Sequence, residues 1–78
     1  MKTTKYFESI QSRPDRVIIK IEWIQFVIDN PISEVIQEDG RMRRWAQIKE
    51  MENRYLRVIL LEDGETVHNA FFDRGFQL

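Results

Sequence analysis

Residues 54–68 read RYLRVILLEDGETVH and decide the fold. In residues 54–61, the alternate positions Leu56, Val58 and Leu60 carry aliphatic side chains, and a strand with one buried face is expected to show this pattern. Asp63-Gly64 follows directly and is a strong signal for a two-residue hairpin turn. Residues 66–72 then form a second predicted strand, so this stretch indicates an antiparallel pair.

The turn also predicts a register for these strands. A two-residue turn pairs Leu60 with Val67, Val58 with Asn69, and Leu56 with Phe71. The preceding strand fits if Ala46 pairs with Val58 and Ile48 with Leu56. The register is informative because a slip by one residue moves every side chain to the other face of the sheet.

Two more strands complete the predicted sheet. Residues 33–38 and 41–48 flank Asp39-Gly40, which is a second hairpin signal. Residues 49–53 form a loop that leads into the strand quoted above. Three successive hairpins predict a four-stranded antiparallel meander over about residues 33–72.

The N-terminal part carries helical spacing over about residues 3–30. Thr3 or Thr4 is a suitable cap for a short helix that reaches Ile10 and is broken at Pro14-Asp15. Residues 17–19 are expected to form an extended link. A second helix is predicted for residues 20–29, with an apolar stripe formed by Ile21, Ile24, Val27 and Ile28 and widened by Trp23 and Phe26.

These elements predict an α+β fold, in which two N-terminal helices cover one face of the meander. The chain is expected to form a single domain over residues 1–78, because a chain of this length supports only one small core. Leu56, Val58 and Leu60 are expected to face the helices. Asn69 and Arg44 fall on the same side, with Arg44 expected at the sheet edge.

The opposite face of the predicted sheet gathers polar and aromatic side chains. Trp45, Ile59 and His68 are expected to lie in one row across three strands. The side chains expected on this face also include Arg43, Gln47, Tyr55, Arg57 and Ala70.

Charge is unevenly distributed along the chain. The net charge is −1, yet residues 41–57 carry five arginines and one lysine against two glutamates. One interpretation is a basic binding surface; the other is that these arginines pair with nearby Glu and Asp. The chain has no cysteine, and no apolar run long enough to span a bilayer, so we expect a cytoplasmic protein without disulfides.

The polar face suggests a site for a phosphodiester. Arg57 and His68 are the predicted catalytic residues, since arginine binds phosphate and histidine titrates near neutral pH. Arg43, Trp45 and Tyr55 are the predicted RNA-binding residues, because aromatic rings stack on bases. The alternatives are a surface histidine and ordinary cross-strand packing of the two aromatic residues.

Motifs for standard cofactors are missing. The sequence contains no Walker loop, dinucleotide-binding glycine pattern, nucleophile elbow or zinc motif. We therefore expect no cofactor and no metal. Asp73-Arg74, which follows the last strand, is interpreted as a local ion pair.

Several short motifs resemble a family of small bacterial proteins within the RelE/ParE-like toxin superfamily, with a layout close to BrnT-type toxins. They are Glu22-Trp23-Ile24, Asn30-Pro31, Asp39-Gly40-Arg41, Arg54-Tyr55-Leu56-Arg57-Val58 and Val67-His68-Asn69-Ala70. The resemblance implies an RNA-directed activity, or descent from one, and a small antitoxin protein as partner.

Two functions follow as hypotheses. The first is the toxin of a bacterial toxin–antitoxin pair, acting as a metal-independent endoribonuclease on single-stranded RNA. The second is a non-catalytic module, or remnant toxin, that docks an acidic antitoxin-like partner, for which a sheet edge could accept an added strand. A structural or regulatory role and a homodimer are also compatible with the sequence, whereas no membrane partner is expected.

Overall fold

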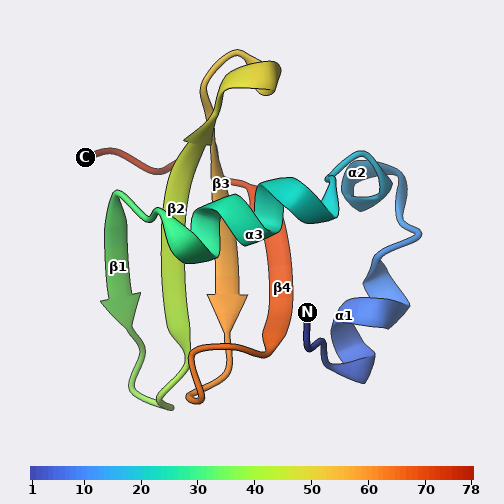
Figure 1. Ribbon diagram of the computed structural model, residues 1–78, viewed down its shortest axis with the longest axis vertical. Helices are drawn as coiled ribbons and strands as arrows, with labels where there is room; N and C mark the ends of the chain where they lie inside the picture. The colour runs from blue at the N-terminus through green and yellow to red at the C-terminus, as the bar shows by residue number, and fades with distance from the viewer.

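The computed structural model describes all 78 residues and contains one four-stranded antiparallel sheet in the order β1-β2-β3-β4. The strands are β1 (Ser33–Ile36), β2 (Met42–Ile48), β3 (Arg54–Leu60) and β4 (Val67–Phe72). Helix α3 (Ile21–Asp29) crosses one face of the sheet, and α1 (Lys5–Ile10) lies beside β4 (Figure 1). The predicted α+β fold and meander are confirmed.

Three helices precede the sheet, where two were predicted. Thr4 caps α1 by accepting a hydrogen bond from the backbone N–H of Phe7 at 3.0 Å. Pro14 begins α2 (Pro14–Val17), because proline fits the first turn of a helix, where its missing N–H is not needed. The prediction of an extended link at residues 17–19 is therefore wrong, since Val17 is helical and Ile18 has helical dihedral angles.

Helix α3 buries most of the predicted stripe, since Ile28 also packs against the core, but Ile21 and Phe26 do not belong to it. Trp23, Ile24 and Val27 are buried, whereas Ile21 and Phe26 remain about half exposed. The helix is thus rotated toward Trp23, whose ring packs edge-on against Phe72 at the end of β4. None of the helices has the length and apolar character that crossing a lipid bilayer requires.

Strand β3 supplies the centre of the core. Leu56, Val58 and Leu60 have no exposed surface, which confirms that they face the helices. They pack in one cluster with α3 and with Ala46 and Ile48 of β2.

The pairing of β2 with β3 differs from the predicted register by two residues. Ala46 pairs with Leu56, and Ile48 pairs with Arg54. The cause is a compact connection, in which a 3-10 helix (Lys49–Met51) is followed by two residues with left-handed backbone angles. A shift by two preserves which side chains share a face, so the predicted faces of these two strands hold.

A β-bulge changes the second half of β4. Leu60 pairs with Val67 as predicted, but Ile59 pairs with Asn69, which leaves His68 as the extra residue. Ala70 then pairs with Val58 and is buried in the core, so its predicted place on the open face is wrong. The predicted pairs of Asn69 and Phe71 are wrong for the same reason.

Both hairpin turns occur where the Asp-Gly signals predicted them, but both loops are longer than two residues. Leu61 and Thr66 close the second loop through a backbone hydrogen bond of 2.9 Å. Asp63 accepts hydrogen bonds from the Thr66 hydroxyl and from two backbone N–H groups, which lowers its pKa to about 2. This network stabilises the wider turn, and Gly64 supplies its positive φ of 70°.

The two edges of the sheet differ in whether another segment pairs with them. At the start of β4, Val67 exchanges backbone hydrogen bonds with Lys2 and Thr4, so residues 2–4 lie along this edge as a short parallel bridge. Strand β1 is the other edge, and no strand pairs with its outer side. It carries the exposed side chains of Val35 and Ile36.

Replacing Leu56 by alanine is expected to lower the free energy of unfolding by about 2–5 kcal/mol, because a fully buried side chain leaves a cavity. Urea unfolding measures the change. Ile36→Ala is the matched control, since Ile36 is 63% exposed, and it should change the free energy by less than about 0.5 kcal/mol. Similar losses in both variants would contradict the burial of this face.

Candidate functional site

The face of the sheet opposite α3 carries a row formed by Trp45, Arg57 and Phe71, which are paired across β2, β3 and β4. Arg43 and Tyr55 lie on the same face, because they alternate with the core residues of their strands. The predicted row of Trp45, Ile59 and His68 is therefore wrong. The shifted β2–β3 pairing and the bulge at His68 replace it with the observed row.

This face is not open at Trp45. The segment after β4, residues 73–78, passes behind the sheet on the side away from α3 (Figure 1). Its Phe76 ring stacks on the Trp45 ring, with 4.6 Å between centroids, and meets the Tyr55 ring edge-on at 4.9 Å. Trp45 is consequently buried, with 5% of its surface exposed.

A carboxylate from the same segment occupies the arginine. Asp73 Oδ2 accepts hydrogen bonds from Arg57 Nε at 2.9 Å, Arg57 Nη2 at 2.7 Å and Trp45 Nε1 at 3.0 Å. Its other oxygen accepts from the Gly75 N–H at 3.1 Å. The Asp73 carboxylate therefore satisfies both the guanidinium group of Arg57 and the indole N–H of Trp45.

The pKa of Asp73 reflects these contacts. Burial acts to raise it, but the hydrogen bonds from Trp45 and Arg57, together with the charge of Arg57, outweigh burial and leave the pKa below its usual value. The side chains are well shielded, with 22% of Arg57 and 11% of Asp73 exposed. Arg57 also stacks between the rings of Trp45 and Phe71, at 5.3 and 4.9 Å.

His68 has a separate set of partners. Its Nδ1 lies 3.1 Å from the hydroxyl of Thr4, and its ring stacks on Tyr6 with 4.9 Å between centroids. Burial and the nearby charge of Arg41 lower its pKa, against a smaller opposing effect of Asp39. His68 is therefore held by α1 and its cap, whereas Arg57 is held by residues 73–78.

The predicted site residues thus fall into two groups. Trp45, Tyr55 and Arg57 lie together, with Arg43 beside Arg57 on the neighbouring strand, paired with Ile59. The structure shows no shared contact between Arg57 and His68. Their catalytic roles, and the RNA-binding roles of Arg43, Trp45 and Tyr55, stay predictions.

The alternative in which the basic excess is paired internally holds for three arginines. Arg41 pairs with Asp39, Arg44 with Glu34, and Arg57 with Asp73. Arg44 lies on the helix side, where it also donates to the carbonyl of Ile28, so its predicted place at the sheet edge is wrong because β2 is an inner strand.

Sequence reasoning missed three residues at this end of the sheet. The expected Asp73–Arg74 ion pair is wrong, because Asp73 bonds to Arg57 instead. No sequence pattern pointed to Phe76. Arg16 of α2 donates to Asn69 Oδ1 and stacks on Phe71 at 5.2 Å. No local pattern marks these contacts, since each joins segments distant in sequence. Asn69 pairs with Ile59 and so lies on the face opposite α3, which makes its predicted place on the helix side wrong.

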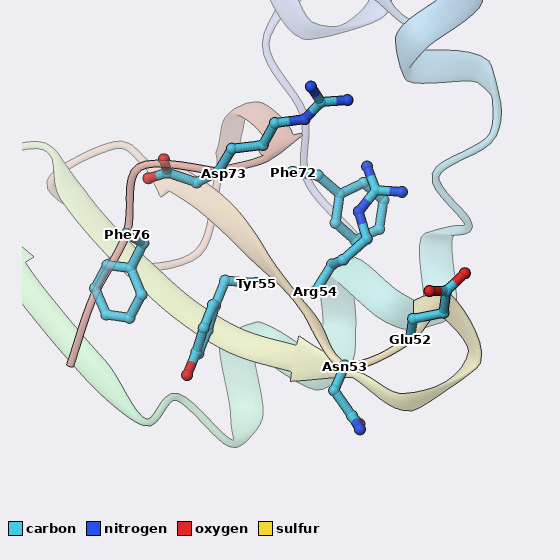
Figure 2. A pocket seen from close by; sticks show the side chains of 8 residues that line it. Glu52, Asn53, Arg54, Tyr55, Phe72, Asp73 and Phe76 are labelled. Carbon is cyan, nitrogen blue, oxygen red and sulfur yellow. The ribbon is translucent and has the colours of Figure 1, made fainter.

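A groove of about 350 Å³ borders this cluster. It lies between the end of the β2–β3 connection and the segment after β4. Figure 2 shows the rings of Tyr55 and Phe76 along one side and Arg54 beside Phe72 on another. Arg74 also lines it.

Comparisons with known proteins add no relative. The chain has no significant match to a protein-family model, a curated protein or a solved structure. The function of these side chains therefore has to be argued from their geometry and chemistry.

Replacing Asp73 by asparagine keeps an oxygen acceptor but removes the charge. We expect a loss of about 1–3 kcal/mol of unfolding free energy at neutral pH, because charged hydrogen bonds are stronger than neutral ones. The folded carboxyl has a lower pKa than the unfolded one, so the unfolded chain binds the proton first as pH falls. The native protein is therefore more stable than the variant above the ordinary carboxyl pKa of 3.8. This extra stability is lost as pH falls through the lowered pKa of Asp73 in the folded protein.

Urea unfolding of the native protein and of the Asp73→Asn variant across acidic pH measures the difference between their free energies of unfolding. Asp63, whose pKa is also lowered, is present in both proteins and cancels in the comparison. A difference in unfolding free energy that stays constant down to the most acidic conditions would contradict the charged Asp73–Arg57 contact.

Proposed function

We propose that the protein is a non-catalytic binding module of the toxin–antitoxin type, which docks an acidic partner segment on the face formed by Trp45, Tyr55 and Arg57. The observation that supports this is the occupant of the face. The protein's own residues 73–78 place a carboxylate on Arg57 and a phenyl ring on Trp45. A partner segment with an acidic residue three positions before an aromatic one has the chemistry to replace them.

The face suits a peptide because it offers two different contacts side by side. Arg57 and the indole N–H of Trp45 converge on one carboxylate oxygen, so an acidic side chain is fixed in position. The rings of Trp45 and Tyr55 form an aromatic corner that accepts a third ring. Together these contacts select an acidic and aromatic segment over a merely acidic one.

A partner that binds this face must displace residues 73–78. Because these residues are tethered to the protein, their effective concentration at the face reaches the millimolar range. Additional contacts are therefore needed elsewhere. Strand β1 offers them, because its outer edge is unpaired and its Val35 and Ile36 side chains are exposed. A partner that adds a strand there gains main-chain hydrogen bonds as well.

A peptide with the sequence of residues 72–78 tests the recognition in trans. The full chain carrying Asp73→Ala and Phe76→Ala leaves the face vacant and is expected to bind this labelled peptide in fluorescence anisotropy titrations. The native chain should bind it at least about tenfold more weakly, because its own segment competes.

The matched controls are peptides in which the Asp or the second Phe is alanine. Each should lose about tenfold or more in affinity, as a charged hydrogen bond or a buried ring is removed. Equal binding of all three peptides, or no binding to the vacated face, would reject the docking proposal.

An endoribonuclease is the second candidate, and the setting of His68 favours it. Its lowered pKa keeps the imidazole neutral near pH 7, and Thr4 contacts Nδ1, which leaves Nε2 for a substrate. In this mechanism His68 removes the proton of a ribose 2′-hydroxyl, whose oxygen bonds to phosphorus as the 5′-oxygen leaves. Arg57 would stabilise the phosphate only after Asp73 releases it.

Cleavage of single-stranded RNA in the presence of EDTA tests this candidate. The rate is expected to rise with pH around a midpoint below 6.5, the ordinary histidine value, because the base must be deprotonated. His68→Gln should reduce the rate by about a hundredfold or more. Arg13→Gln, which changes an exposed arginine, should not. Full activity in the His68 variant would exclude this mechanism.

A further inference from the structure

The groove beside residues 73–78 has two arginines without an acidic partner. Arg54 and Arg74 both line it, and neither belongs to any of the ion pairs in the protein. Both also line a neighbouring groove of about 290 Å³, together with Arg16. The two guanidinium groups therefore stand at the boundary between the two grooves, where their charge remains available.

Arg54 is an exposed residue whose guanidinium rests on an aromatic ring. Its guanidinium lies over the ring of Phe72, 4.8 Å from the centroid. Stacking of this kind leaves the N–H donors at the edge of the group free for a ligand. Arg54 is thus prearranged to donate hydrogen bonds toward the groove (Figure 2).

The acidic side chains of the groove oppose an anion only weakly. Asp73 lines it, but its carboxylate is turned onto Arg57, Trp45 and the Gly75 N–H. Glu52, Arg54 and Arg74 are all exposed, so solvent screens these three charges alike. With Asp73 neutralised by Arg57, the two arginines against one glutamate leave the lining of the groove with one net positive charge.

An aromatic wall faces these charges. The Tyr55 ring stands edge-on to Phe76, which is itself fixed by stacking on Trp45. A planar ring system entering the groove can pack on this wall, as bases do on exposed aromatic side chains. A volume of about 350 Å³ is within the range of sites for small ligands.

We infer that this groove binds a free nucleoside phosphate, with the phosphate on Arg54 and Arg74 and the base against Tyr55 and Phe76. Two guanidinium groups match the several oxygens of a phosphate, and the adjoining wall matches a planar base. This site goes beyond the docking proposal and does not rest on it, because it uses the groove with residues 73–78 in place.

Calorimetric titration of the full native chain tests the inference with adenosine 5′-monophosphate as the probe. Adenosine and inorganic phosphate, each carrying half of the proposed contacts, should bind at least about tenfold more weakly. Arg54→Gln and Arg74→Gln should each weaken binding of the nucleotide by about tenfold, since each loses a charged hydrogen bond. Arg13→Gln removes an equal charge from an exposed position outside these grooves and should leave the affinity unchanged.

The other outcomes overturn the inference. Absence of nucleotide binding, or an equal loss in the Arg13 variant, would show that the groove is not a specific site. Binding of a pentanucleotide without binding of the mononucleotide would assign the groove to a nucleic-acid strand. Tighter binding of the peptide with the sequence of residues 72–78, with the same dependence on Arg54 and Arg74, would assign the groove to protein docking. Thermal unfolding of each variant confirms that the fold is retained.

Discussion

The alternation of side chains along β3 is the constraint on which the other features depend. Leu56, Val58 and Leu60 have no exposed surface, and α3 packs over them. Tyr55 and Arg57 must then point to the opposite face. A slip of one residue would bury the charge of Arg57 without a partner, which costs several kcal/mol, so the register is strongly fixed.

Arg57 extends this constraint to the far face of the sheet. Because Arg57 is partly buried between Trp45 and Phe71, its charge needs a carboxylate, and Asp73 provides one directly after β4. That contact sets the direction of residues 73–78 and brings Phe76 onto Trp45. The ion pair therefore both closes the face and defines the chemistry that a competing ligand must supply.

The arginines of this protein divide by whether an acidic side chain neutralises them. Arg41, Arg44 and Arg57 have such partners, so three of the five arginines in residues 41–57 are neutralised within the protein. Arg54 and Arg74 have none and share a groove. Arg43 on β2 also lacks an acidic partner, but only Arg54 and Arg74 line a groove together.

Much of the fold follows from the sequence alone. The alternation of residues 54–61, the Asp-Gly turns and the helical spacing before Asn30 determine the meander, helix α3 and the faces of β2 and β3, because these patterns act locally. They also place Trp45, Tyr55 and Arg57 on one face. Tertiary structure alone decided the bulge at His68 and the contact of Asp73 with Arg57. The alternation of side chains along a strand does not reveal where a bulge inserts an extra residue. The pairing of Asp73 with Arg57, among many other charges, depends on segments that meet only after folding.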